Sequence, residues 1–274
     1  MAYDGSEFAG WAAQPDQRTV AGVLLDGLLR LFGQAAGLTV AGRTDAGVHA
    51  TGQVCHVDLP EVVWRELSRH STRTASEQVV RRMAGVLPPD VRVTAVTEVP
   101  AEFDARFSAL RRRYEYRVCD QPSGASPLRR QDTLSWPRPL DVANLNTAAQ
   151  GLLGEHDFAA YCRRKENATT IRTLLSLDWR RDHDDTVVAR VEADAFCQAM
   201  VRSLVGGLLP VGDGRRPAEW PASLLSRRDR ASEVVVAPAH GLTLVGVDYP
   251  RDVAGYVTQA RQARQRRGAP AAAD

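Results

Sequence analysis

One short segment gathers residue types that can do chemistry. It reads Ala41-Gly42-Arg43-Thr44-Asp45-Ala46-Gly47-Val48-His49-Ala50, so two glycines enclose an arginine, a threonine and an aspartate. Glycine tolerates positive φ and permits close approach, so a tight loop could present Asp45 and Arg43 as a reactive carboxylate and its cationic neighbour. The plainer alternative is a glycine-rich turn in which the aspartate bonds its own backbone. Spacing alone does not decide between a reactive loop and a plain turn.

Several other chemistries lack a motif in this chain. It contains no Gly-x-x-x-x-Gly-Lys, Gly-x-Gly-x-x-Gly or His-Glu-x-x-His spacing, which disfavours nucleotide hydrolysis, nicotinamide binding and zinc peptidase activity. His156 and Cys162 could share a metal, but nothing supplies the remaining ligands, so we expect no metal site. No Cys-x-x-Cys pair occurs, so neither a disulfide framework nor a zinc ribbon is expected, and a reducing compartment is indicated. The four cysteines are Cys55, Cys119, Cys162 and Cys197.

A second candidate is Arg202, which lies in a helical stretch that is apolar on nearly every side. A buried charge there costs several kcal/mol, on the order of 3–5, unless it is paired. Arg202 could lie on the one solvent-exposed face of the helix, together with Gln198 one turn earlier. Alternatively it reaches an acidic partner, for which Asp45 is the candidate. An arginine beside a carboxylate favours the charged form that a nucleophile or base requires.

Tyr114 is a third candidate because it lies within a run of arginines that includes Arg111, Arg113 and Arg117. Most tyrosines at such positions are ordinary half-buried sheet residues. An aromatic ring flanked by guanidinium groups is also what a platform for stacked RNA bases looks like. The 35 basic residues include only one lysine, which fits either phosphate recognition by arginine or a GC-rich coding sequence.

The elements that must position these residues alternate along the first half. Thr19 can cap a helix with Val20, Leu24, Leu28 and Leu31 on one stripe, ended by Gly33. The spacing then predicts a strand over 55–59, a helix over 75–87 opened by a Thr74–Glu77 capping box, and a strand from Val91.

A similar order recurs in the second half. Alternation predicts a strand over 113–118 with one aromatic and one charged face, and Asp141 can cap a following helix. Further strands are predicted over 171–179, 187–193 and 242–249, with a helical stretch over 196–209. In the first of these strands one face is predicted to carry Ile171, Thr173, Leu175, Leu177 and Trp179. The tail from about Gln262 has no core stripe, and we expect it to be mobile.

This order indicates an α+β protein of two similar halves. We place the N-terminal half at 1–106 with the Asp45 loop, the C-terminal half at 107–250 with Tyr114 and Arg202, and a terminal segment at 251–274. The 274 residues carry a net charge of +2 and no apolar run long enough to span a membrane. The N-terminus lacks the layout of a secretory signal. We therefore expect a soluble cytoplasmic protein.

With these motifs in order, the sequence resembles the tRNA pseudouridine synthase A family, whose members isomerise uridines 38 to 40 in the tRNA anticodon stem-loop. The resemblance covers nearly the whole chain, and the block at 41–50 is its most specific part. The matching motifs are Tyr3-Asp4-Gly5, Gly10-Trp11, the block at 41–50, Phe103-x-Ala105-Arg106-Phe107, Arg113-Tyr114-x-Tyr116, Gly154-x-His156-Asp157-Phe158, Met200-Val201-Arg202 with Gly206, Ala237-Pro238 and Gly241-Leu242.

The resemblance implies a site and a fold. Asp45 would be the essential carboxylate nucleophile, Arg43 would hold the flipped nucleotide, Tyr114 would stack on the target uracil, and Arg202 would pair with Asp45. Further candidate RNA contacts are His49, Arg111 and Arg113. The implied fold has two α+β halves that share a central, largely antiparallel sheet with a cleft between them, commonly as a homodimer. No cofactor is implied, because the isomerisation neither gains atoms nor releases electrons.

The chain departs from the family pattern in places. Only Met1 and Ala2 precede Tyr3, where the family usually has several more residues of first strand, and Asp194-Ala195-Phe196-Cys197 replaces a more glycine-rich approach to Arg202. Two rival functions are a non-catalytic RNA-binding module, which would keep the arginines and Tyr114, and a glycoside hydrolase. The latter needs two opposed carboxylates about 5 to 10 Å apart, and the block offers one.

Overall fold

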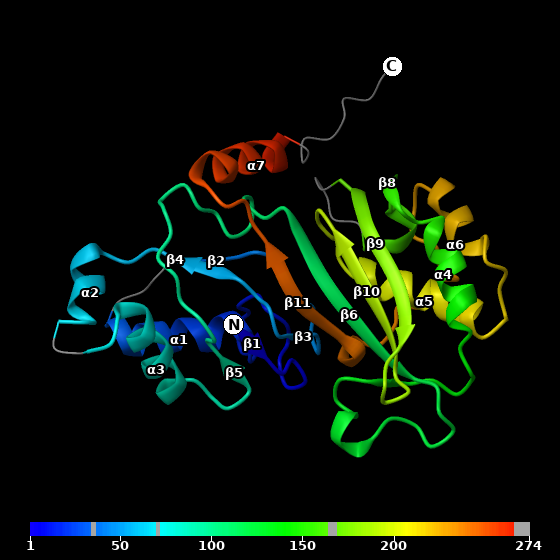
Figure 1. The fold of residues 1–274 in the computed structure, drawn as a ribbon, viewed down its shortest axis with the longest axis horizontal. Helices are drawn as coiled ribbons and strands as arrows, with labels where there is room; N and C mark the ends of the chain where they lie inside the picture. Colours follow the sequence, from blue (N-terminus) through cyan, green and yellow to red (C-terminus); the bar gives the residue numbers. More distant parts are fainter. Residues whose placement is uncertain (34–36, 70–71, 164–168, 266–274) are drawn as a thin grey trace.

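The computed structural model describes residues 1–33, 37–69, 72–163 and 169–265. Its strands contribute either to a large central sheet or to a small two-stranded one (Figure 1). The small sheet pairs β2 (Leu38–Val40) with β4 (Cys55–Val57). The central sheet contains β1 (Ala2–Tyr3), β3 (His49–Ala50), β5 (Val91–Arg92), β6 (Arg111–Cys119), β7 (Leu134–Ser135), β8 (Gly154–Asp157), β9 (Ile171–Arg181), β10 (Val187–Ala193) and β11 (Leu242–Asp248).

The central sheet has the order β5-β1-β3-β11-β6-β10-β9-β8, with β7 beside β6. Among the described residues, its pairings are antiparallel apart from β3 with β11 and β6 with β7. The protein is therefore mixed α+β with a large, mostly antiparallel central sheet, which confirms the predicted fold class.

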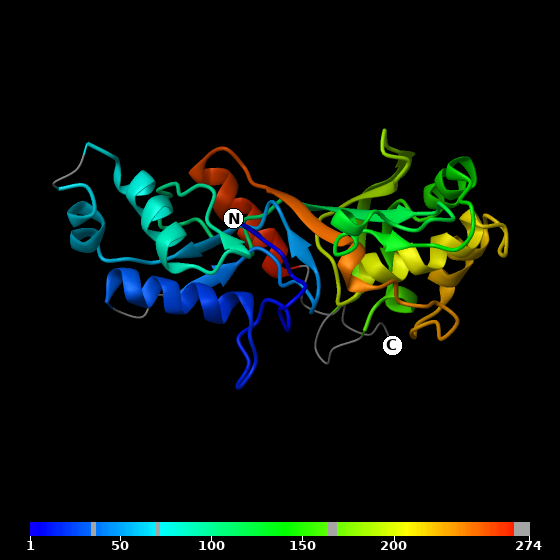
Figure 2. The same ribbon diagram turned by 90° about the horizontal axis from the view of Figure 1, so that it is seen from below.

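Helices pack beside the β5 edge and beside the β8 edge of this sheet (Figure 1). Figure 2 shows α1 and α5 running along the same side of it. The α-helices are α1 (Val20–Phe32), α2 (Glu61–Glu66), α3 (Ala75–Val86), α4 (Val142–Gln150), α5 (Met200–Gly212), α6 (Trp220–Ser223) and α7 (Val253–Gln265), and the short 3₁₀ turns are η1 (Pro127–Arg129), η2 (Ala159–Tyr161), η3 (Leu224–Ser226) and η4 (Ala239–Gly241). In the described part of the chain, no helix is both long enough and apolar enough to cross a membrane.

The predicted helix starts are confirmed by their caps. Gly22 N–H donates to the Thr19 hydroxyl at 3.2 Å, and Gly33 ends α1 at a φ of 69°. The capping box of α3 is complete, since Thr74 and Glu77 exchange both bonds. Asp141 caps α4 by accepting from two backbone amides. The helices α2, α6 and α7 were not predicted, and residues 266–274 of the tail expected to be mobile lie outside the described residues.

The central strand β6 has the two faces that its alternation predicts. Tyr114, Tyr116 and Val118 are buried on the α5 side, and Arg113 and Glu115 alternate with them. The neighbour β10 is in register, with Val191 opposite Tyr114. β6 has strands on both sides in the sheet, and the face that carries Tyr114 and Tyr116 is part of the core.

The prediction of one continuous apolar face on β9 is wrong. Glu192 pairs with Ser176 and Ala193 pairs with Leu174, so Leu175 is an extra residue on β9. Such a bulge reverses the alternation. Leu177 and Trp179 remain buried, whereas Leu175 is 48% exposed.

The last strand joins the two predicted halves. β11 pairs parallel with β3, which lies within 1–106, and antiparallel with β6, which lies within 107–250. β3 and β6 are not neighbours in the sheet. The continuous sheet therefore depends on residues 242–248, which come late in the chain.

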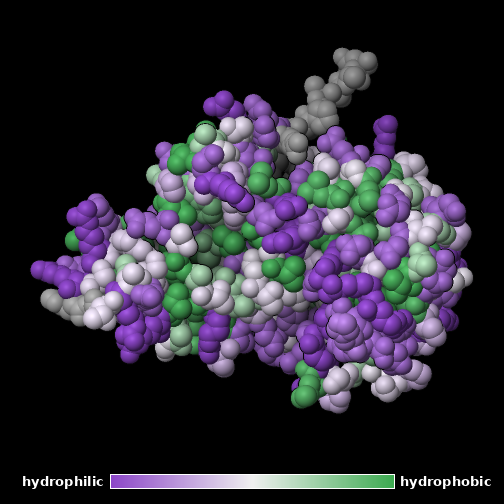
Figure 3. Space-filling model, viewed as in Figure 1, coloured by the Kyte–Doolittle hydropathy of each residue, from purple (hydrophilic) through white to green (hydrophobic). Residues whose placement is uncertain are grey.

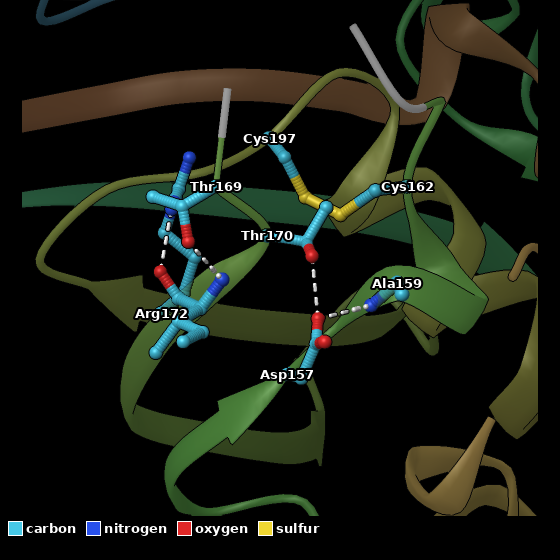
Figure 4. The surroundings of a disulfide bond; sticks show 8 residues. Asp157, Ala159, Cys162, Thr169, Thr170, Arg172 and Cys197 are labelled. Atoms are coloured by element: carbon cyan, nitrogen blue, oxygen red, sulfur yellow. Dashed lines mark hydrogen bonds between the residues drawn. A yellow bond between two sulfur atoms is a disulfide. The ribbon is translucent and has the colours of Figure 1, made fainter. Parts of the chain in front are cut away.

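A disulfide corrects the expectation drawn from cysteine spacing. Cys162 and Cys197 are 35 residues apart in sequence, but their Cα atoms lie 5.8 Å apart and their sulfur atoms are bonded. The end of η2 meets the segment before α5, where Arg163 N–H donates to the Gln198 carbonyl at 3.0 Å. In Figure 4, Asp157 accepts hydrogen bonds beside this disulfide. The two cysteines are brought together by the tertiary fold, so their spacing in the sequence could not predict the disulfide.

Candidate active site

Residues 41–48 form a tight loop between β2 and β3, and the last two residues of the block at 41–50 are β3. Trp11 N–H donates to the Thr44 carbonyl at 3.0 Å, so an N-terminal segment supports the loop. Gly47 adopts a φ of 76°, a conformation that favours glycine. The loop leaves the Asp45 side chain 32% exposed, which makes its carboxylate accessible from outside the protein.

Two further glycines let the N-terminal segment press against this loop. A Cβ at Gly10, where φ is 98°, would lie 3.0 Å from the Thr44 carbonyl oxygen. A Cβ at Gly5 would lie only 2.1 Å from the Val48 carbonyl oxygen. The glycines of the Tyr3-Asp4-Gly5 and Gly10-Trp11 motifs are therefore needed for backbone contact with the loop.

A buried polar network holds the loop from the sheet side. The Tyr3 hydroxyl and the Thr44 hydroxyl share a hydrogen bond of 2.8 Å. The Gln53 side-chain amide donates to the Tyr3 oxygen at 3.2 Å and to the Gly42 carbonyl at 2.9 Å. Burial raises the pKa of Tyr3 to about 12, so the phenol stays a neutral hydrogen-bonding group.

Arg202 reaches this loop from α5. Its Nη1 lies 3.5 Å from Asp45 Oδ2, and its Nε donates to the Ala237 carbonyl at 2.7 Å. The Arg202 side chain is 20% exposed. The Ala237 carbonyl thus fixes one edge of the guanidinium while another edge faces the carboxylate. Of the two sequence-based interpretations of Arg202, the geometry matches the one with an acidic partner.

Tyr114 lies on β6, close enough to Asp45 for the carboxylate charge to affect it. Its ring packs edge-on against Phe196 at a centroid distance of 5.2 Å, and only 8% of the residue is exposed. Burial raises the pKa of Tyr114 well above its usual range, and the negative charge of Asp45 is a smaller cause in the same direction. The phenol is therefore protonated at neutral pH, and its hydroxyl can donate a proton to a hydrogen bond.

The other predicted residues of the loop have different surroundings. Arg43 is exposed two residues before Asp45. His49 is only 7% exposed. Its Nδ1 accepts from Gly5 N–H at 3.0 Å, and its Nε2 lies 2.7 Å from the Gln131 carbonyl. Both ring nitrogens are thus engaged by the protein, so His49 ties the loop to its surroundings and offers neither nitrogen to RNA.

Arg111 and Arg113 lie on the opposite face of β6 from Tyr114, because side chains alternate along a strand. Both bind Asp248, and Arg111 also pairs with Glu192 at 3.3 Å. Together with Leu175, Val247 and Tyr249 they line an open depression of about 720 Å³. Figure 3 shows hydrophilic side chains across the middle of the view, with hydrophobic patches among them. The structure therefore does not bring these two arginines to Asp45.

Three contacts around the site were missed by sequence reasoning. Phe196 packs on Tyr114, Ala237 accepts from Arg202, and Arg112 bonds the Ala41 carbonyl at 2.8 Å. A signal for Arg112 was present, since the period of two places it on the same face as Tyr114. The other two contacts arise from folding and have no local pattern.

The arrangement can support nucleophilic or general-base chemistry. One accessible carboxylate faces a guanidinium, and the buried neutral phenol of Tyr114 lies on β6 within reach of the charge of Asp45. Among the described residues, no group of three His, Cys, Asp or Glu side chains could hold a metal ion.

Comparison with known proteins identifies the chain. A family model described as tRNA pseudouridine synthase matches residues 148–250. A tRNA pseudouridine synthase A from Frankia casuarinae is 58% identical over 92% of this chain and 88% of its own length. Proteins of the same name from Streptomyces griseus and Mycobacterium leprae are 52% and 48% identical, covering 98% and 92% of this chain and 94% and 88% of their own lengths. The chain belongs to the tRNA pseudouridine synthase A family.

Proposed function

We propose that this protein converts uridine to pseudouridine at positions 38, 39 and 40 of the tRNA anticodon stem-loop, with Asp45 as the essential nucleophile. Family membership makes the chain an isomerase that acts on tRNA. The observation that supports the choice of Asp45 is its accessible carboxylate, which lies 3.5 Å from Arg202. The resemblance in the motifs carries the choice of tRNA positions.

The reaction is balanced within the nucleotide. The bond from ribose C1′ to uracil N1 breaks, the freed base turns, and a bond forms from C1′ to C5. The C5 proton leaves and N1 gains one, so no atom is lost overall and no cofactor is required. Asp45 acts as the nucleophile, at the ribose or at the uracil ring, and the bond that it forms is broken again before product release.

Each neighbour of Asp45 has a separate task in this proposal. Arg202, held by the Ala237 carbonyl, orients the carboxylate and balances its charge. Tyr114 supports the detached base, so that the base turns without diffusing away. The phenol is protonated and can relay the C5 proton.

RNA must present the target base outside its stack. Flipping a nucleotide costs a few kcal/mol, on the order of 2–4, which contacts to the backbone must offset. Arg43 is exposed beside Asp45 and is placed to hold the flipped nucleotide. Arg111 and Arg113 lie on the other face of β6, so in this proposal they touch RNA only away from the target base. His49 is a positioning residue.

Two properties of the protein follow from the resemblance. We propose a homodimer, which light scattering on the purified chain can test. We also propose that the protein acts in the cytoplasm, where its tRNA substrate is found. There the Cys162–Cys197 disulfide would be an exception among cytosolic proteins.

The function is tested by mapping pseudouridine in tRNA by mass spectrometry after incubation with wild type and Asp45→Ala. Wild type should modify uridines 38 to 40, whereas Asp45→Ala should form no product and still bind tRNA. Asp26→Ala, which removes an exposed carboxylate from α1, is the matched control and should remain active. Turnover by Asp45→Ala would refute the nucleophile, and product at other uridines would refute the positions. A wild type that binds tRNA without turnover would indicate the non-catalytic module.

A further inference from the structure

Arg112 is a buried guanidinium that serves the protein backbone. The residue is 7% exposed. Its Nη2 donates to the carbonyls of Ala41 and Arg106 at 2.8 and 2.6 Å. Its Nη1 donates to the carbonyls of Asp194 and Ala109 at 2.7 and 3.4 Å. Four neutral acceptors from three separate segments thus converge on one side chain.

Two of those segments carry parts of the candidate active site, and the third, at 106–109, leads directly into β6. Ala41 opens the loop that presents Asp45, four residues further on. Asp194 precedes Phe196, whose ring packs on Tyr114. Arg112 itself lies two residues before Tyr114, on the same face of β6. One guanidinium therefore connects the nucleophile loop, the stacking tyrosine and the ring that packs on that tyrosine.

We propose that Arg112 is a positioning residue that sets the Asp45 loop against Tyr114 through these four carbonyls. This inference rests on the proposed roles of Asp45 and Tyr114. Arg112 does not touch substrate, because its Nη1 and Nη2 atoms donate to backbone carbonyls and the residue is buried.

The planar guanidinium is needed for this geometry. Arginine presents five N–H donors in a rigid fork, whereas lysine presents three on one atom. A lysine ammonium could reach some of the four carbonyls, but it could not bond at once to those that Nη1 serves and those that Nη2 serves. Misplacement of reacting groups by about 1 Å can cost on the order of 100-fold in rate. The expected effect is therefore on the chemical step, with tRNA affinity largely preserved.

The test compares Arg112→Met and Arg112→Lys with Arg190→Met. Arg190 lies on the neighbouring β10, where its side chain is 46% exposed and pairs with Glu115 at 3.1 Å. For each full-length variant, the single-turnover rate of pseudouridine formation, the Kd for tRNA and the Tm are measured. We expect Arg112→Met to lose at least about tenfold in rate with Kd changed less than about threefold. Arg112→Lys should lose less, and Arg190→Met should match wild type.

Three results would overturn the proposal. A wild-type rate in folded Arg112→Met would show that the carbonyls need no guanidinium. A loss confined to tRNA affinity would make Arg112 a binding residue. If Arg112→Met fails to fold, Arg112→Lys decides, and its unfolding too would assign the residue to stability alone. Activity in Asp45→Ala would instead refute the proposed function, whatever the Arg112 variants do.

Discussion

Gly206→Ala tests whether the site depends on how closely the chain packs against α5. Gly206 lies about one turn after Arg202 on this helix. A Cβ there would sit 1.7 Å from the Val235 carbonyl oxygen, whereas ordinary contact begins at 3.4 Å. The added methyl group therefore forces the segment at 235–237 and the helix apart by about 1.7 Å. That segment contains the Ala237 carbonyl, which accepts from Arg202 at 2.7 Å.

The size of the effect follows from that hydrogen bond. A displacement of this size breaks the bond between Arg202 Nε and the Ala237 oxygen, and hydrogen bonds to charged groups contribute about 1.5–3 kcal/mol. If the guanidinium loses its orientation toward Asp45, the rate should fall about 10- to 100-fold, since 1.4 kcal/mol corresponds to about tenfold. Overpacking should also lower the free energy of unfolding by about 1–3 kcal/mol.

The assay is single-turnover pseudouridine formation at a temperature where the variant is folded by circular dichroism. Gly85→Ala is the control, because Gly85 lies within α3 and a Cβ there meets nothing within 4 Å. Gly85→Ala should keep the wild-type rate and gain up to about 1 kcal/mol of stability from helix propensity. A wild-type rate in folded Gly206→Ala would refute the link between this contact and the orientation of Arg202.

Three other outcomes follow from the structure. Thr74→Ala removes the capping box of α3 and should lower the free energy of unfolding in urea by about 1 kcal/mol; an unchanged value would contradict the cap. The hydrogen bond from Arg181 holds the pKa of Asp120 below its usual range, so the pair stabilises the fold above about pH 4 and this contribution is lost as the pH falls further. Arg181→Met should cost about 1–2 kcal/mol at pH 7 and flatten the acid limb of the stability profile, which urea titrations between pH 2 and about pH 7 would measure. Affinity for tRNA should fall steeply as salt rises, because phosphate contacts release counterions, and a flat filter-binding titration would exclude an arginine-lined RNA surface.

Local signals predicted the parts of the fold that short-range physics decides. Thr19, Thr74 and Asp141 each start a helix where predicted, because a cap depends on groups within three residues. The alternation around Tyr114 likewise predicted a strand with one aromatic and one charged face, which is β6. Turn chemistry and side-chain period act within a few residues, so they are readable from sequence alone.

Long-range contacts explain what sequence could not predict. The bulge at Leu175 depends on how β9 pairs with β10, and Cys162 meets Cys197 only after folding. The alternation of side chains along a strand places Arg112 on one face and Arg111 and Arg113 on the other. It does not say which of the two faces is buried, and the structure supplies that. A row of arginines looks like one basic patch in sequence, whereas the strand distributes it to two faces.

Residue types raised Asp45 and its pairing with Arg202 as one alternative, and only the family resemblance favoured it over the plainer interpretations. Asp45 and Arg202 are 157 residues apart in sequence, and no spacing rule connects two such positions. The structure adds the contacts that hold them, namely Ala237 on Arg202 and Gly10 against the Asp45 loop. These contacts explain physically why the Ala237-Pro238 and Gly10-Trp11 motifs are needed at the site.

The position of β11 constrains the order in which the molecule can be built during synthesis. Until residues 242–248 leave the ribosome, β3 and β6 each present an unpaired edge. Nascent chains that end before Leu242 therefore expose two unpaired strand edges, and the two parts of the central sheet are not yet joined. The continuous central sheet can therefore form only after residues 242–248 have been synthesised.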